Sequence, residues 1–177
     1  MSIQSLKESL PDFAKDIRLN ISTVLTVEGA PGLSKTQIGL ISLSCAYATK
    51  NNAVISHLSD EFSSVLSDAE VTAAKSAATI MAMNNIYYKF VHLAEDPEFK
   101  NLRANLRMTV IGRPGVDKID FEMMCLAVSI INGCGMCIAA HKDNLIKAEI
   151  TRETIQSIVR VTSVIQASAQ AISIKDL

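Results

Sequence analysis

The chain has 177 residues with a formal net charge of −1, and 49% of its residues are hydrophobic while 20% are charged, which is enough for one well-buried core. Because there is no basic excess and no aromatic residue interleaved with Lys or Arg, binding to nucleic acid is not expected. Aromatic residues make up only 5% of the chain and Trp is absent, a composition that suits closely packed helices better than a β-sandwich.

Signals for export or membrane insertion are not recognised in the sequence. Residues 1–7 lack the basic start and the apolar core of a signal peptide, and the apolar runs are shorter than the roughly 20 residues of a membrane span. Four cysteines in a chain of this length do not indicate a structural disulfide framework. We therefore expect a soluble, cytoplasmic protein with a single domain over residues 1–177 and no membrane partner.

Apolar residues recur at helical spacing along most of the chain, which predicts an all-α fold. Ser34 and Ser67 each open a capping box, and Asp120 and Thr151 are expected as N-caps of later helices. Gly and Pro punctuate residues 96–115, which are expected to be irregular or short-helical. The expected helices cover residues 2–20 with a new start at Pro11, 34–49, 53–66, 67–90, 120–131, 134–148 and 151–174.

A shift of the sequence by 84 positions superposes the helix breaks and caps of its two halves. The pairs that coincide are Lys50 with Cys134, Ala53 with Cys137, His57 with His141, Ser67 with Thr151 and Ile38 with Glu122. Only the second half carries the thiols and the carboxylate. We therefore predict two helical units, a degenerate one over about 34–94 and an active one over about 118–177.

The second unit contains two thiols, Cys134 and Cys137, followed by His141 four residues later. Asn132 and Gly133 tolerate turn geometry, so the thiols are expected to open a helix, where free N–H groups and the helix dipole favour a thiolate. A CxxC pair closes a very small ring and suits reversible dithiol exchange. Cys137 and His141 share one helix face at this spacing and can touch.

Two other interpretations of these residues are weaker. Cys134, Cys137, His141 and Glu122 could hold zinc, but structural zinc usually takes a second ligand pair from another loop, and the sequence offers none. The two cysteines could also be small core residues, although the neighbouring Gly133 lowers local packing. Glu122 favours redox chemistry, because a carboxylate that orients an imidazole makes it a better base for the Cys137 proton.

The pattern Glu-x11-CxxC-xxx-His, formed by Glu122, Cys134, Cys137 and His141, resembles the AhpD (alkyl hydroperoxide reductase D) branch of the carboxymuconolactone decarboxylase-like superfamily. Further similarity lies at residues 14–17, 81–85, 106–108 and 114–115, so that the resemblance covers essentially the whole chain. It implies an all-helical fold unrelated to thioredoxin, typically a homotrimer, with no bound cofactor or metal.

The resemblance also implies an activity and roles for individual residues. Family members reduce alkyl hydroperoxides and re-reduce the partner peroxiredoxin AhpC, with electrons from a lipoyl group on a dihydrolipoamide acyltransferase. By position, Cys137 is the inner cysteine that becomes the sulfenic acid. Cys134 is the outer cysteine, which donates a proton and resolves the intermediate to a Cys134–Cys137 disulfide. Glu122 and His141 match the proton relay.

This chain departs from the family at Met136, where members often have a histidine between the two cysteines. Since a thioether cannot carry a proton, we hypothesise that peroxidase turnover is slower while thiol exchange is intact. If Met136→His left the pH–rate profile unchanged, this hypothesis would lose its basis. A decarboxylase-like lyase is the alternative within the superfamily, but that chemistry needs no CxxC. The remaining cysteines and histidines, and most methionines, are expected in core or surface roles: Cys45, Cys125, His57, His92, Met81, Met83, Met123 and Met124.

Overall fold

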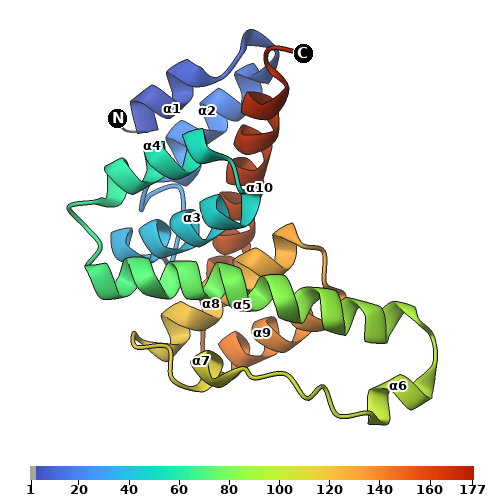
Figure 1. Cartoon of the computed structure of the whole chain (residues 1–177). Helices are drawn as coiled ribbons and strands as arrows, with labels where there is room; N and C mark the ends of the chain where they lie inside the picture. Colours follow the sequence, from blue (N-terminus) through green and yellow to red (C-terminus); the bar gives the residue numbers. More distant parts are fainter. Residues whose placement is uncertain (1–2) are drawn as a thin grey trace.

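The computed structural model describes residues 3–177; the expected start of the first helix at Ser2 lies outside the described residues. The described residues form helices and no strand, which confirms the all-α fold. In chain order they are α1 (Ile3–Ser9), the 3₁₀ helix η1 (Asp12–Ala14), α2 (Lys15–Val24), α3 (Lys35–Thr49), α4 (Asn52–Phe62), α5 (Asp68–Leu93), α6 (Pro97–Asn101), α7 (Thr109–Gly112), α8 (Lys118–Ile131), α9 (Gly135–Lys147) and α10 (Arg152–Ile174) (Figure 1).

Local capping chemistry sets where the longer helices begin. Ser34 and Ser67 form the complete capping boxes that the sequence predicts, in which the serine hydroxyl accepts a backbone N–H and the third helical residue bonds back to the serine N–H. The hydroxyl of Thr151 accepts the backbone N–H of Thr154 at 3.1 Å and so caps α10 as expected.

The predicted N-cap of α8 was wrong by three residues. Asp117, rather than Asp120, caps this helix, since its carboxylate accepts the backbone N–H groups of Ile119 at 2.8 Å and Asp120 at 3.1 Å. Asp120 lies in the first turn and accepts a hydrogen bond from the Gln37 amide at 2.8 Å, which ties the start of α8 to the start of α3. A tertiary partner therefore uses the carboxylate that local sequence assigns to the cap.

Helices α3 and α8 form the centre of the molecule. Residues 38–46 of α3 and 121–129 of α8 are all buried, as expected for helices that neighbours cover on every side. They pack against each other and each contacts α5 and α10, while α9 packs on α8 and α5 (Figure 1). The central position of α8 places Glu122 inside the protein.

The helix pattern of the two halves is similar. Each of the central helices α3 and α8 is followed by a shorter helix, α4 or α9, and then by a long one, α5 or α10. The N-caps of the long helices, Ser67 and Thr151, lie 84 positions apart, the offset found in the sequence. The division into units over about 34–94 and 118–177 stays a prediction.

The segment between α5 and α8 projects from the body of the molecule. The C-terminal end of α5 and the whole of α6 extend away from the other helices. The chain then returns through α7, which lies near α9 (Figure 1). None of the described helices combines the length and the apolar character needed to cross a membrane.

Candidate active site

The turn between α8 and α9 positions the two thiols. Gly133 adopts φ = 65°, a left-handed conformation that glycine enters without a Cβ clash, and the chain then enters α9 with Cys134 as its N-cap. The sulfur of Cys134 accepts the backbone N–H of Cys137 at 3.3 Å. The predicted break at Asn132–Gly133 and the predicted position of the thiols at a helix N-terminus are thus confirmed.

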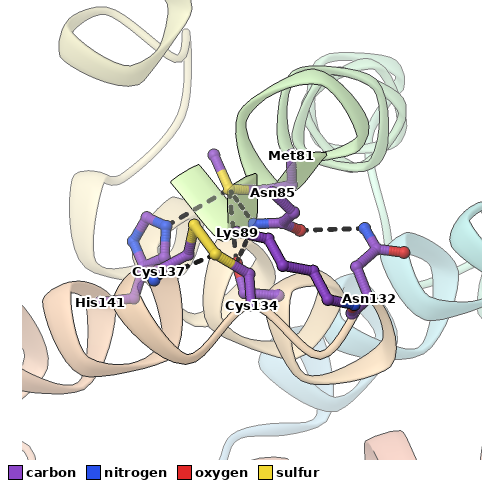
Figure 2. Close-up of a disulfide and its surroundings, with 8 residues drawn as sticks. Met81, Asn85, Lys89, Asn132, Cys134, Cys137 and His141 are labelled. Carbon is purple, nitrogen blue, oxygen red and sulfur yellow. Dashed lines mark hydrogen bonds between the residues drawn. A yellow bond between two sulfur atoms is a disulfide. The ribbon is translucent and has the colours of Figure 1, made fainter. Parts of the chain in front are cut away.

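Cys134 and Cys137 form a disulfide with their Cα atoms 5.3 Å apart (Figure 2). Cys134 is completely buried, whereas Cys137 keeps 7% of its surface exposed. This order is opposite to the one that the labels outer and inner imply. In this conformation Cys137 is the more exposed of the two residues.

Glu122 and His141 form a buried pair. The Nδ1 atom of His141 lies 2.7 Å from a carboxylate oxygen of Glu122, and each residue is 8% exposed. Burial by itself would raise the pKa of Glu122, but the hydrogen bond and charge of His141, the Asn144 amide and Lys118 together outweigh it and hold the pKa below its usual value. The carboxylate therefore stays ionised beside the imidazole.

The second nitrogen of His141 contacts Met81. Its Nε2 atom lies 3.3 Å from the Met81 sulfur, and no hydrogen bond joins the imidazole to Cys137 within the part of the chain that the structure describes (Figure 2). Met81 is buried as predicted, yet it is also a site residue that sequence reasoning missed. Its place in the 81–85 stretch, which contributes to the family resemblance, was the available signal.

Asn85 joins α5 to the end of α8. Its amide donates to the Ser129 hydroxyl at 2.9 Å and accepts from the Asn132 amide at 2.9 Å, while the Lys89 ammonium donates to the Asn132 carbonyl at 3.0 Å (Figure 2). These bonds hold the residue that precedes the Gly133 turn, so α5 fixes the position from which the CxxC segment begins.

A pocket of about 290 Å³ opens beside Cys137. Apolar side chains from α5, α7 and α9 make up most of its wall, and the polar groups that reach it come from the site and from α5. The lining residues are Met81, Asn84, Tyr88, Met108, Ile111, Met136, Cys137, Ala140 and His141. A small, mainly apolar cavity with a few polar groups is typical of a site for a small organic ligand.

Comparisons with known proteins agree with this geometry. Residues 97–175 match the model of the carboxymuconolactone decarboxylase family. The chain is 51% identical to a Brucella anthropi protein over 99% of both chains. It is 50% identical to one from Methylocella silvestris over 100% of this chain and 98% of the relative, and 48% identical to one from Coxiella burnetii over 95% of both. All three relatives are named alkyl hydroperoxide reductase AhpD. The chain belongs to the AhpD family. It is therefore an enzyme of the oxidoreductase class, and the resemblance drawn from the Glu-x11-CxxC-xxx-His pattern is confirmed.

The position at which this AhpD family member departs from the pattern lies at the pocket. Met136 is 37% exposed and lines the cavity beside Cys137. A histidine at this position would face the same cavity, whereas the thioether adds apolar surface to it.

Glu122 lines a second pocket, of about 510 Å³. Asn144 and the cationic residues Lys118 and Lys147 also line it. In this AhpD family member, His141 thus lines the cavity beside Cys137 and Glu122 lines the second one.

The other cysteines and histidines lie outside the site. Cys45 and Cys125 are fully buried as predicted; burial raises the pKa of Cys45 to about 12 despite a hydrogen bond with Thr162, and raises that of Cys125 together with the charge of Glu122. His92 is exposed, as expected for a surface residue, and His57 is half-buried. Within residues 3–177, no cluster of three His, Cys, Asp or Glu residues is arranged to hold a metal ion.

Proposed function

We propose that this protein reduces alkyl hydroperoxides through a dithiol–disulfide cycle of Cys134 and Cys137. The observation that carries the proposal is the position of Cys137, which lines a mainly apolar pocket together with His141. Glu122 is hydrogen-bonded to Nδ1 of that imidazole. An apolar wall suits an alkyl group, and a thiol with an adjacent base suits attack on an O–O bond. The name of the relatives, alkyl hydroperoxide reductase, supports the same substrate class.

The proposed proton relay follows from the hydrogen-bonding roles of the pair. An ionised carboxylate can only accept, so Nδ1 of His141 carries the hydrogen that faces Glu122, and Nε2 is free to take the proton of the reduced Cys137. Once protonated, Nε2–H has the Met81 sulfur as an acceptor. Glu122 stabilises the imidazolium and connects it to the second pocket, where protons can exchange with solvent.

In this proposal the dithiol is oxidised in two steps. The Cys137 thiolate attacks the terminal oxygen of the hydroperoxide, an S–O bond forms while the O–O bond breaks, and the alkoxide takes the proton held by His141 to leave as an alcohol. The Cys134 thiol then attacks the Cys137 sulfenic acid, which releases water and forms the disulfide. The Cys137 N–H that points at the Cys134 sulfur stabilises negative charge on Cys134 during this step.

Two electrons and two protons must then return to the disulfide. We propose that a lipoyl group on a dihydrolipoamide acyltransferase donates these electrons, with no bound cofactor in this chain. We also propose that the reduced dithiol passes electrons on to the disulfide of the peroxiredoxin AhpC. A cytoplasmic location belongs to this proposal, because a reducing compartment keeps the dithiol available.

Assembly into a homotrimer is also part of the proposal. Large apolar side chains are exposed along the end of α5 and the projecting segment after it: Ile86, Phe90, Leu93, Leu102 and Leu106. Such clustered apolar surface is typical of a protein–protein interface, and in this proposal further copies of the same chain cover it.

A peroxidase assay with dihydrolipoamide as the donor and cumene hydroperoxide as the substrate tests the proposal. We expect turnover by the unmodified protein, loss of at least about 100-fold in Cys137→Ser and Cys134→Ser, and a loss of about 10- to 100-fold in Glu122→Gln. Cys45→Ala, which changes a thiol outside the site, should retain activity. Full activity of Cys137→Ser would overturn the assignment of the nucleophile, and stoichiometric zinc bound at neutral pH would overturn the redox function.

A further inference from the structure

Asn84 lines the pocket beside Cys137 and is only 4% exposed. Its side-chain oxygen is inaccessible to solvent and has no hydrogen-bond partner among residues 3–177. Asn84 is therefore a buried polar side chain whose oxygen is left without a partner among residues 3–177.

The adjacent Asn85 provides an internal comparison on the same helix. Its amide bonds to Ser129 and Asn132, so both its donor and its acceptor are used within the protein. Asn85 contributes to helix packing, and the contrast shows that α5 can satisfy a buried asparagine where it serves the fold.

A buried amide oxygen without a partner costs folding free energy, because it has lost its hydrogen bonds to water. An apolar side chain of similar volume at position 84 would avoid that cost. The amide gains a partner when a ligand with polar atoms enters the pocket, and either its N–H groups or its oxygen can face that ligand after rotation about the last side-chain bond.

We infer that Asn84 binds the hydroperoxide group of the substrate and donates a hydrogen bond to the oxygen that leaves as alkoxide; this inference rests on the proposed function. Asn84, Cys137 and His141 line one cavity, so a peroxide placed for attack by Cys137 lies within the same space as the amide. Negative charge develops on the leaving oxygen while the S–O bond forms and the O–O bond breaks. A fixed N–H donor stabilises that charge until His141 supplies the proton.

The variant Asn84→Leu removes the amide at similar volume. We expect the reduced variant to be oxidised by hydroperoxide about 10- to 100-fold more slowly than the unmodified protein, chiefly through the rate at saturation. The factor should be the same for hydrogen peroxide, tert-butyl hydroperoxide and cumene hydroperoxide, because all three share the O–O group. Reduction of the disulfide by dithiothreitol should change less than about twofold, since that reaction involves no oxygen atom.

Thermal unfolding separates this role from a packing role. Asn84→Leu should keep or raise the melting temperature, whereas Asn85→Leu should lower it, because only Asn85 loses hydrogen bonds made within the protein.

Three results would count against the inference in different ways. If Asn84→Leu reacts with all three peroxides as fast as the unmodified protein, Asn84 does not bind the hydroperoxide, and the proposed function stands. If the loss grows with the size of the alkyl group, Asn84 only shapes the cavity wall. If even the unmodified reduced protein is not oxidised by any of the peroxides, both the inference and the proposed function fail.

Discussion

Glu122 is buried in α8 between residues that are all buried themselves, and it is the one carboxylate with this degree of burial among residues 3–177. An isolated carboxylate in such a place would bind a proton. His141 prevents this by placing a ring nitrogen 2.7 Å away, with the Asn144 amide 3.4 Å from the same oxygen. The negative charge of Glu122, which takes part in the proposed relay, thus also stabilises the fold.

Replacing Glu122 with Gln should make unfolding less dependent on acid pH. The pKa of Glu122 is lower in the folded protein than its usual value of 4.5, so its ionised form stabilises the fold above about pH 4.5 and this stabilisation is lost as the pH falls through the folded-state pKa. We expect Glu122→Gln to lower the free energy of unfolding by about 1–2 kcal/mol at pH 7 and by much less at pH 3. Urea unfolding at both pH values measures this, and a difference that is larger at pH 3 would contradict the assignment.

At the scale of the helices, α9 uses a redox residue for a structural task. Cys134 is the N-cap of α9, a position at which Ser, Thr, Asp and Asn are preferred, and its sulfur accepts the Cys137 N–H. In the opposite half, the N-cap of α4 is Asn51, whose side chain accepts the N–H of Val54 at 3.1 Å. The thiol thus has the capping role at the start of α9 that an amide oxygen has at the start of α4.

Two variants of Cys134 separate its capping role from its redox role. Neither Cys134→Ser nor Cys134→Ala can form the disulfide, but only the serine retains an acceptor for the Cys137 N–H. We expect Cys134→Ser to be about 1 kcal/mol more stable than Cys134→Ala in chemical denaturation under reducing conditions. If the two variants are equally stable, or the alanine variant is more stable, the sulfur makes no useful cap.

Local signals account for what could be predicted of the elements. The capping boxes at Ser34 and Ser67 and the Asn132–Gly133 break depend on residues within one turn, and the structure has all three. The start of α8 was misplaced because both Asp117 and Asp120 are suitable N-cap residues, and local sequence does not show that Asp120 bonds to Gln37 in another helix. Met81 was missed for a similar reason, since its place at the site depends on the packing of α5 against α9.

At the scale of the whole molecule, the fold brings two distant parts of the sequence to one pocket. α5, from the first half, supplies Met81 and Asn84, while α9, from the second half, supplies Cys137 and His141. The spacing Glu-x11-CxxC-xxx-His predicted the second group from sequence, because its members lie within 20 residues of one another. The pocket itself could not be predicted in this way, because it depends on how the two halves pack.

The apolar surface of α5 and the projecting segment leads to a prediction about assembly. Light scattering coupled to gel filtration should give a mass three times the 19.1 kDa of one chain, and Leu93→Glu should reduce it by placing a charge in the interface. Leu93 is 64% exposed in a single chain, so the substitution should leave the fold intact. Leu19→Glu, at a 60% exposed position on α2, is the matched control and should not change the mass. A single-chain mass for the unmodified protein would contradict the trimer.

In the proposed cycle the hydroperoxide oxidises the sulfur of Cys137, and Cys134 resolves the product. The most direct test treats reduced Cys134→Ser with one equivalent of cumene hydroperoxide, traps sulfenic acid with dimedone and locates the adduct by mass spectrometry. We predict close to one adduct per chain on Cys137, because the resolving thiol is absent, and none on the buried Cys45 or Cys125. An unmodified Cys137 after the peroxide has been added, or an adduct on another cysteine, would contradict the account.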